Sequence, residues 1–365
     1  MTIFPGASQL PFEIPVYTPP QPESGVFDPD VPGYGGQLTH PVAIAAYEAL
    51  CTQLTPDITQ LRVDLSSLKF TAGSDLSVPM KGAIAAFVFD HPESQYCTIS
   101  PSSYDATSCT FRIRQDRDAR VQKEALDKVI ADFRAGFDFS LGVVEQYRYI
   151  HDYICDLAVY DLPAASATIP TDAHTAFGLL TMGKAVVCEG YSKAFKVLCD
   201  AVDLPCILAV GEAVKDYDKD GQLSFSGYSN HMWNMVRVDG AWYSVDTTWD
   251  DIALTLPTGK EISFPSYRYF LNNAPFRPEN PEQDHRTSGK IYFAYDHPMI
   301  FALPEFSSRP IVNYLAVYDT AGRMLSLTDL TRLSPLADYP ITLPDPAYTV
   351  KHFLLSASSL HPIGG

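Results

Sequence analysis

The 365-residue chain has no run of about 18 apolar residues, so the sequence predicts no membrane-spanning helix. It is also poor in positive charge, because 26 Lys and Arg stand against 43 Asp and Glu and give a formal net charge of −17. A surface of this sign repels nucleic acid and anionic membranes, and it weakly favours cationic substrates. We therefore expect a soluble protein whose partner is neither nucleic acid nor a membrane.

Metal-binding signatures of the zinc type are missing as well. The sequence has neither a CxxC pair nor an HExxH motif. It has seven cysteines, which leave one over if six are paired. Cys97 and Cys109 flank a Ser/Pro/Asp-rich turn between two strand-like runs, so a cross-strand disulfide between them is sterically conceivable. Free buried thiols are the alternative.

One acidic stretch matches most of a calcium-binding loop. Oxygen-bearing side chains fall at positions 1, 3, 5 and 9, with glycine at position 6; these four residues are Asp216, Asp218, Asp220 and Ser224. Position 12 is Gly227, where a bidentate Glu is expected, and the flanking residues have the pattern of strands rather than helices. An acidic hairpin tip is therefore the alternative to a calcium site, and we expect no cofactor to be required.

The residues with catalytic potential are concentrated between positions 188 and 249. A thiol, an imidazole and a carboxylate follow one another as Cys188, His231 and Asp246. Apolar residues at helical spacing begin directly after Cys188, which predicts that the thiol lies at a helix N-terminus. Unpaired N–H groups and the positive end of the helix dipole favour a thiolate there. A buried inert thiol is the alternative, but the downstream His and Asp favour a catalytic triad.

A hairpin is predicted to bring the imidazole and the carboxylate together. Asp-Gly at residues 239–240 separates two alternating runs and is a strong signal for a two-residue turn. That loop length places His231, Trp233 and Asp246 on one face, with His231 opposite Thr248. His231 and Asp246 then become diagonal neighbours about 7 Å apart, within reach of their side chains. A three-residue loop would put the two residues on opposite faces.

These residues resemble the core of the transglutaminase-like superfamily, in its bacterial branch. The resemblance covers residues 143–275, and its most specific motifs are the runs at 187–192, 231–236 and 242–249. Asp250 and Asp251 resemble the acidic end of the last motif, and residues 266–271 resemble the Tyr/Phe-rich strand that follows it. The resemblance implies an α+β fold with a papain-like, transglutaminase-like core, in which a nucleophile helix packs on an antiparallel sheet.

The resemblance also implies an acyl-transfer reaction on protein or peptide amides. Cys188 would attack the carbonyl, His231 would move the proton, and Asp246 would hold the imidazole. The backbone N–H of Cys188 is a plausible oxyanion donor, and the helix at 143–160 is the place to look for a second.

The acyl acceptor stays open at this stage. With water the protein is a peptidase or amidase, and with an amine it is a protein-glutamine cross-linker. A non-catalytic peptide-binding surface protein is the third alternative. We expect hydrolysis, and we interpret Trp233 and Trp249 as core and cleft-wall aromatics rather than as a lid over the thioester.

Four regions follow from composition and periodicity. They are a Pro/Gly-rich arm at 1–41, an N-terminal α/β unit at 42–140, the catalytic core at 141–285, and a small β-rich C-terminal module at 286–365. The pattern predicts helices at 41–54, 119–135 and 143–160, and strands at 82–90, 96–100, 108–114, 311–318, 323–328 and 348–355.

Two features bear on location. The first ten residues lack the basic start and apolar run of a signal peptide, so we expect any leader to lie outside this sequence. Residues 318–325 and 351–355 resemble short repeat-like tails of secreted proteins of gut Gram-positive bacteria. An extracellular or cell-surface location is therefore expected.

Overall fold

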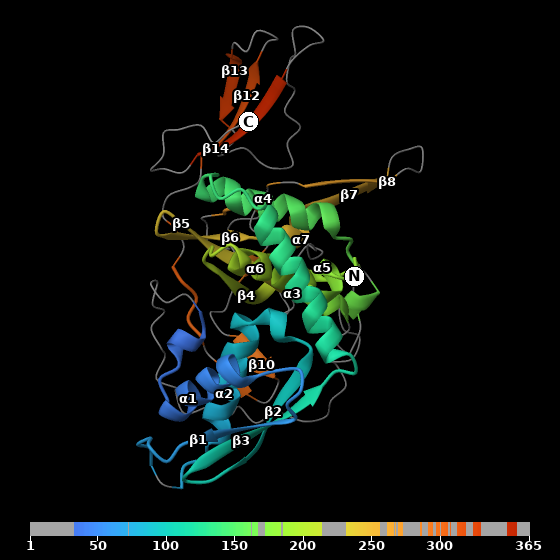
Figure 1. Ribbon diagram of the computed structural model, residues 1–365. Helices are drawn as coiled ribbons and strands as arrows, with labels where there is room; N and C mark the ends of the chain where they lie inside the picture. Colours follow the sequence, from blue (N-terminus) through green and yellow to red (C-terminus); the bar gives the residue numbers. More distant parts are fainter. Residues whose placement is uncertain are drawn as a thin grey trace, which may run out of the picture.

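The structure is a computed structural model of the chain (Figure 1). It describes residues 33–71, 73–161, 163–166, 172–183, 185–213, 231–255, 261–265, 267, 269–272, 285–286, 291–294, 297–299, 301–305, 307, 312–318, 324–329 and 349–355. The described residues form helices and antiparallel sheets, which confirms the predicted α+β class.

The N-terminal unit packs two helices against a three-stranded antiparallel sheet of order β1-β3-β2. Its elements are α1 (Pro41–Gln53), β1 (Gln60–Asp64), α2 (Ser77–Asp90), β2 (Cys97–Tyr104) and β3 (Ser108–Gln115). Leu50, Leu61, Met80 and Phe111 are among the residues that fill the core between helices and sheet. The predicted helix at 41–54 and the two strands of the β2–β3 hairpin are confirmed.

The predicted strand at 82–90 is wrong, because these residues form the second half of α2. Most of the helix is buried, with apolar side chains all round it and a 3-10 turn, Pro92–Ser94 (η3), after its end. A helix without a polar face shows no helical period in its sequence. A short, wholly apolar run therefore has the same signature as a buried strand.

The disulfide that was sterically conceivable between Cys97 and Cys109 is not formed. The two residues occupy opposite ends of the β2–β3 ladder, since Cys97 pairs with Gln115 and Cys109 pairs with Tyr104. All seven cysteines are free thiols.

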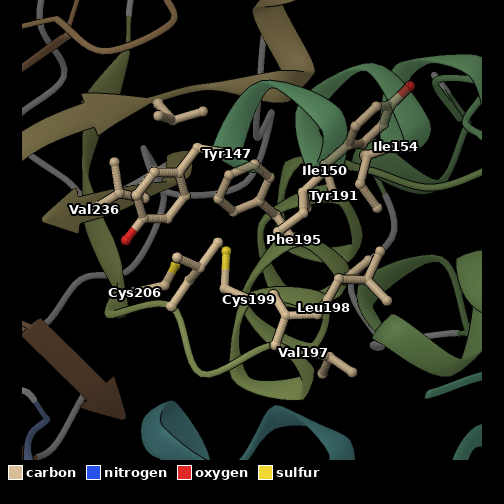
Figure 2. Close-up of a cluster of buried hydrophobic side chains, with 14 of the residues drawn as sticks. Tyr147, Ile150, Ile154, Tyr191, Phe195, Val197, Leu198, Cys199, Cys206 and Val236 are labelled. Carbon is tan, nitrogen blue, oxygen red and sulfur yellow. The ribbon is translucent and has the colours of Figure 1, made fainter. Parts of the chain in front are cut away.

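The central part of the chain packs one helix, α6, against a four-stranded sheet of order β6-β5-β4-β9, and three further helices pack on α6 (Figure 1). The elements are α3 (Ala119–Gly136), α4 (Val143–Leu157), α5 (Ala176–Leu180), α6 (Cys188–Ala201), β4 (Cys206–Ala213), β5 (His231–Val238), β6 (Ala241–Val245) and β9 (His285–Arg286). Figure 2 shows side chains of α4, such as Tyr147 and Ile150, packed on Tyr191 and Phe195 of α6. Burial of this cluster holds α6 between α4 and the sheet.

The predicted helix at 119–135 is confirmed as α3, whose Leu126 and Phe133 join the core cluster while Val121 is 64% exposed. Helix α4 ends at Leu157 rather than at Tyr160. Tyr160 leaves the helix to form a parallel bridge with Val186, just before α6.

After β6 the chain makes a short helix, α7 (Thr247–Asp250), and a two-stranded sheet of β7 (Asp251–Thr255) and β8 (Glu261–Pro265). The predicted Tyr/Phe-rich strand at 266–271 is wrong for the residues described, because 269–271 are a turn and bends. Leu271 has a φ of 55°, and Asn272 forms an isolated bridge with Ser244. The backbone of Tyr269 is instead hydrogen-bonded to aspartates of the α7 turn.

The C-terminal strands are confirmed where they were predicted. They form a three-stranded antiparallel sheet of order β13-β12-β14, preceded by a two-stranded sheet: β10 (Ile291–Ala294), β11 (His297–Met299), β12 (Val312–Tyr318), β13 (Met324–Asp329) and β14 (Thr349–Leu355). Among the described helices, none combines the length and hydropathy that crossing a membrane requires.

Candidate active site

Cys188 is the first residue of α6, as predicted, and the N-cap position before it is Val187. The backbone that leads into the helix is fixed by two hydrogen bonds. Val187 N donates to the oxygen of Ala173 at 3.0 Å, and Val186 N donates to the oxygen of Val159 at 2.8 Å. The Cys188 side chain is partly exposed. The thiol therefore lies at the positive end of the helix dipole and within reach of solvent.

The glycine two residues after the thiol is required by close packing. A Cβ at Gly190 would lie 2.6 Å from the backbone oxygen of Ala173 and 2.7 Å from Cβ of Val186. No side chain fits there without moving the backbone. The Cys-Glu-Gly order thus lets α6 begin directly against the segment that positions Cys188.

Buried hydrogen bonds fix the first turns of α6 on the start of β5. Ser192 Oγ donates to the oxygen of Met232 at 2.8 Å, and Asn234 Nδ2 donates to the oxygen of Ser192 at 2.9 Å. Asn234 is the one polar residue on a face predicted to be apolar, and this contact is its role. The distance between Cys188 on α6 and His231 on β5 is held by this pair of bonds.

The predicted hairpin register is confirmed through Asn234, which pairs with Val245, to Val238, which pairs with Ala241. Beyond Val245 the ladder stops, because Thr247–Asp250 coil into α7. The predicted pairing of His231 with Thr248 is therefore wrong. His231 and Asp246 nevertheless meet, with Nε2 and Oδ2 2.6 Å apart and both side chains buried.

Asp246 has a different role for each carboxylate oxygen. Oδ2 binds His231, while Oδ1 accepts from the backbone N–H groups of Thr248 at 3.0 Å and Trp249 at 3.3 Å. Asp246 is thus the N-cap of α7. Because Nε2 is engaged by Asp246, Nδ1 is the nitrogen left to exchange a proton with the thiol of Cys188.

The surroundings of His231 favour its charged form. Burial lowers its pKa, but Asp246 and Cys188 raise it, and the result is a pKa of about 10. At neutral pH the imidazole is therefore a cation between a carboxylate and a thiol. This is the environment that stabilises a cysteine thiolate.

Aromatic rings enclose the imidazole. Trp233 is fully buried and stacks on His231, with ring centroids 6.0 Å apart. The ring centroid of Trp249 lies 5.5 Å from that of His231. Tyr269 packs edge-on against Trp249. Trp233 is a core aromatic, as predicted, and Trp249 is partly exposed beside the imidazole.

Tyr160 lies beside the nucleophile. Its bridge to Val186 places it two residues from Cys188 in the paired segment, and its ring is 6.4 Å from that of Tyr191. Burial, with Cys188 and Asp246, raises the pKa of Tyr160 to about 12, so the hydroxyl keeps its proton at neutral pH. The end of the segment predicted as a helix at 143–160 therefore borders the thiol, although Tyr160 itself is not helical.

A second cluster, around His151, supports the first, and no sequence pattern used above predicted it. His151 of α4 is fully buried between two carboxylates, with Nδ1 2.9 Å from Asp152 Oδ1 and Nε2 3.2 Å from Asp250 Oδ2. Burial lowers the pKa of His151, but Cys155 and the two aspartates outweigh it and hold the pKa well above its usual value. His151 is therefore a buried cation.

Hydrogen bonds connect this cation to the catalytic candidates. Asp250 accepts from the backbone N–H of Tyr269 at 3.0 Å, and the oxygen of Tyr269 accepts from Asp246 N at 3.0 Å. The path from His151 thus runs through Asp250 and Tyr269 to Asp246, which binds His231. Asp251 also supports this region, since Tyr191 donates to it at 2.6 Å. Both acidic residues therefore have structural contacts in this region.

One signal in the sequence could have identified His151. Tyr147, Ile150 and Ile154 are the apolar stripe of α4, and His151 has the i+4 position from Tyr147 on the same stripe. A histidine inside an apolar stripe needs a buried partner. That partner lies 99 residues further along the chain, which no local pattern reveals.

The remaining predicted ligand set lies outside the described residues. Asp216, Asp218, Asp220 and Ser224 fall in the segment between β4 and β5, and the calcium interpretation stays a prediction. Within the part of the chain that the structure covers, no group of three or more His, Cys, Asp or Glu side chains could hold a metal ion.

The central part of the chain matches a protein-family model. The model of the Transglutaminase-like superfamily matches residues 137–247. Kyphoscoliosis peptidase of Mus musculus is 26% identical over 246 residues, which are 65% of this chain and 36% of the mouse protein. Kyphoscoliosis peptidase of Homo sapiens is 30% identical over 156 residues, 41% of this chain and 22% of the human protein. The chain thus spans about a third or less of these relatives.

Among solved structures, the periplasmic domain of TgpA from Pseudomonas aeruginosa is similar over 43% of this chain and 66% of its own. The identity is 14% and the TM-score is 0.24.

The electrostatic environment of the thiol predicts selective alkylation. In a Cys51→Ser background, which removes the exposed thiol, iodoacetamide at mildly acidic pH should label Cys188 ahead of every other cysteine, because thiolate reacts and thiol does not. His231→Gln should slow this labelling. Peptide mass spectrometry of quenched samples gives the rates, and equal labelling across all sites would contradict the assignment.

Removal of the carboxylate charge should weaken the nucleophile without unfolding the hairpin. Asp246→Asn keeps an oxygen to cap α7 but lowers the pKa of His231, so turnover of an activated ester should fall by orders of magnitude, about 10²-fold or more. Asp203→Asn is the matched control, since it removes the same charge from a side chain that is 77% exposed. Similar rates in the two variants would exclude Asp246 as the orienting group.

His151→Gln should destabilise the protein by about 3–5 kcal/mol, because it leaves the buried Asp250 without its cation. A raised folded-state pKa means that the contribution of His151 is fully present below its unfolded pKa of about 6.5 and is lost as the pH rises through the folded value. Thermal unfolding across pH should show the largest loss of stability, relative to the parent protein, in mild acid and a smaller loss in alkali. A loss that grows with pH would show that His151 is neutral in the folded protein.

Proposed function

We propose that this chain, whose residues 137–247 form a transglutaminase-like domain, is a cysteine acyl-transfer enzyme that hydrolyses protein or peptide amides. The observation that carries the proposal is the buried bond of 2.6 Å between His231 and Asp246, in a site that also couples His231 to Cys188. Thiol, imidazole and carboxylate have the order and roles of nucleophile, base and orienting group.

The reaction follows from the charge states of the site. The Cys188 thiolate attacks the carbonyl carbon, and the His231 imidazolium gives its proton to the departing amine as the C–N bond breaks. The thioester that remains is attacked by water, from which His231 takes a proton. The acid is then released and the thiolate restored. Asp246 stays ionised and stabilises the imidazolium in both halves.

The oxyanion of each tetrahedral intermediate needs hydrogen-bond donors. Cys188 is the first helical residue, so its backbone N–H has no acceptor within α6. This N–H lies at the positive end of the helix dipole, and we assign it as the first oxyanion donor. The Tyr160 hydroxyl, which stays protonated beside Cys188, is the second candidate.

Two observations support water as the acceptor. The Cys188 side chain is partly exposed, so solvent reaches the atom that would carry the thioester. The two mammalian relatives are named as peptidases. The net charge of −17 favours lysine-bearing amines to a smaller degree.

The acceptor can be tested without knowledge of the natural substrate. The acyl-enzyme is formed from a p-nitrophenyl ester, and a lysine analogue is added at rising millimolar concentrations. Mostly acid should be released, because a solvent-accessible thioester does not exclude water. Near-complete conversion to amide would instead identify an amine-transferring enzyme.

Two controls separate catalysis from background. The double variant Cys188→Ala/Cys51→Ser should release p-nitrophenol no faster than buffer, and Cys51→Ser alone should turn the ester over at the parent rate. A parent protein that forms no acyl-enzyme at all would contradict the proposal and favour a peptide-binding role.

A further inference from the structure

A second set of thiol, imidazole and carboxylate lies in the N-terminal unit, outside the site just described. Cys51 Sγ is 3.4 Å from His91 Nε2, and His91 Nδ1 is 3.1 Å from Glu93 Oε1. Cys51 is exposed, and the side chains of His91 and Glu93 are 33% and 35% exposed. The three residues therefore form a nucleophile, base and orienting group that open to solvent.

Three different elements build this cluster. Cys51 is in the last turn of α1, His91 is the C-cap residue of α2, and Glu93 lies in the 3-10 turn that follows. A cation is stabilised at a helix C-terminus by the negative end of the dipole. The ring of Phe87 packs 5.0 Å from the imidazole and fixes its plane. The fold thus holds a cationic imidazole against the exposed thiol.

The neighbouring groups favour the charged imidazole. Burial lowers the pKa of His91, but its hydrogen bonds to Cys51 and Glu93 raise it to about 10. Tyr47 Oη, 3.5 Å from His91 Nε2, donates to Asp90 at 2.9 Å. Asp200 of α6 lies near enough to interact with the charges of His91 and Glu93, and it is paired with Lys196. The groups that surround His91 are therefore mostly anionic or able to become so.

We propose that Cys51 is a modification site that undergoes exchange with small uncharged disulfides. The geometry supplies an exposed thiol paired with an imidazolium, which is the arrangement that keeps a thiolate at neutral pH. Carboxylates at Glu93 and Asp90, together with the net charge of −17, disfavour anionic reagents. Among disulfides, the neutral ones are therefore the expected partners. The proposal does not depend on the function of Cys188.

The exchange step balances without any further oxidant. The Cys51 thiolate attacks one sulfur of the disulfide, its S–S bond breaks, and a new S–S bond forms between Cys51 and half of the reagent. The other half leaves as a thiolate and takes a proton from His91 or solvent. An added thiol reverses the step by the same route.

Cys97, a partly exposed thiol of the same unit, provides an internal comparison. Cys97 is partly buried, its Sγ faces the oxygen of Ser94, and burial together with Asp116 raises its pKa to about 12. It has no imidazole partner among the described contacts. Cys97 should therefore react slowly at every pH at which Cys51 reacts quickly.

The test uses 2-hydroxyethyl disulfide as the probe and the full chain with Cys188→Ala as the parent. Samples are quenched in acid at intervals, and peptide mass spectrometry gives the rate of mixed-disulfide formation at Cys51. The variants are His91→Gln and Glu93→Gln in the same background. Circular dichroism confirms that each variant is folded, and Cys97 is the control thiol within each sample.

At about pH 6 the His91→Gln variant should react at Cys51 about tenfold more slowly than the parent, because an unpaired thiol is almost fully protonated there. Above about pH 9 the order should reverse, since the unpaired thiolate is the stronger nucleophile. The rate at Cys51 in the Glu93→Gln variant should lie between those of the parent and of His91→Gln. Exposure alone cannot produce this crossover. Equal rates for parent and His91→Gln at about pH 6, or a Cys51 no faster than Cys97, would overturn the proposal.

Discussion

The Asp246 carboxylate is the interaction on which the rest of the site depends. Its Oδ1 caps the N-terminus of α7, where the hairpin ends, and its Oδ2 binds His231 at 2.6 Å. A buried carboxylate that loses its partners costs several kcal/mol, so the cap and the ion pair stabilise each other. The end of the β5–β6 ladder at Val245 and the orientation of the imidazole are therefore consequences of one side chain.

Support for Asp246 comes from a part of the chain that carries no catalytic candidate. His151 of α4 binds Asp250, Asp250 holds the backbone of Tyr269, and Tyr269 accepts from Asp246 N. Two buried histidines and their aspartates thus hold the two ends of α7, with Asp246 at its N-cap and Asp250 as its last residue. Such a network gives high rigidity only when every member is satisfied. Tyr269 lies in a turn and not a strand, since both its backbone N–H and its oxygen are used here.

The active-site hairpin and helix could be predicted because their signals are local. Asp239-Gly240 sets the register, and the register alone places His231 near Asp246. The helix α2 could not be predicted, because burial on all sides removes the polar face that a periodicity argument needs. His151 lies on the apolar stripe of α4, which indicates burial, but its partner Asp250 is 99 residues further along the chain. Contacts between residues far apart in the sequence decide whether such an apolar run is a helix or a strand. They also decide whether a polar residue on an apolar stripe is merely tolerated there or is a structural cation.

The two imidazole-paired thiols show how the same residue types are tuned by helix ends. Cys188 begins α6, where the dipole favours the thiolate itself, and its histidine comes from a strand. Cys51 lies in the last turn of α1, where the dipole opposes a thiolate. His91 is the C-cap of α2, where the dipole favours the imidazolium. The first arrangement stabilises the anion directly and the second stabilises its counter-ion. Both imidazoles have aromatic neighbours, but Cys51 is exposed whereas Cys188 is only partly so. The first site therefore suits a substrate held in place, and the second suits a small reagent from solvent.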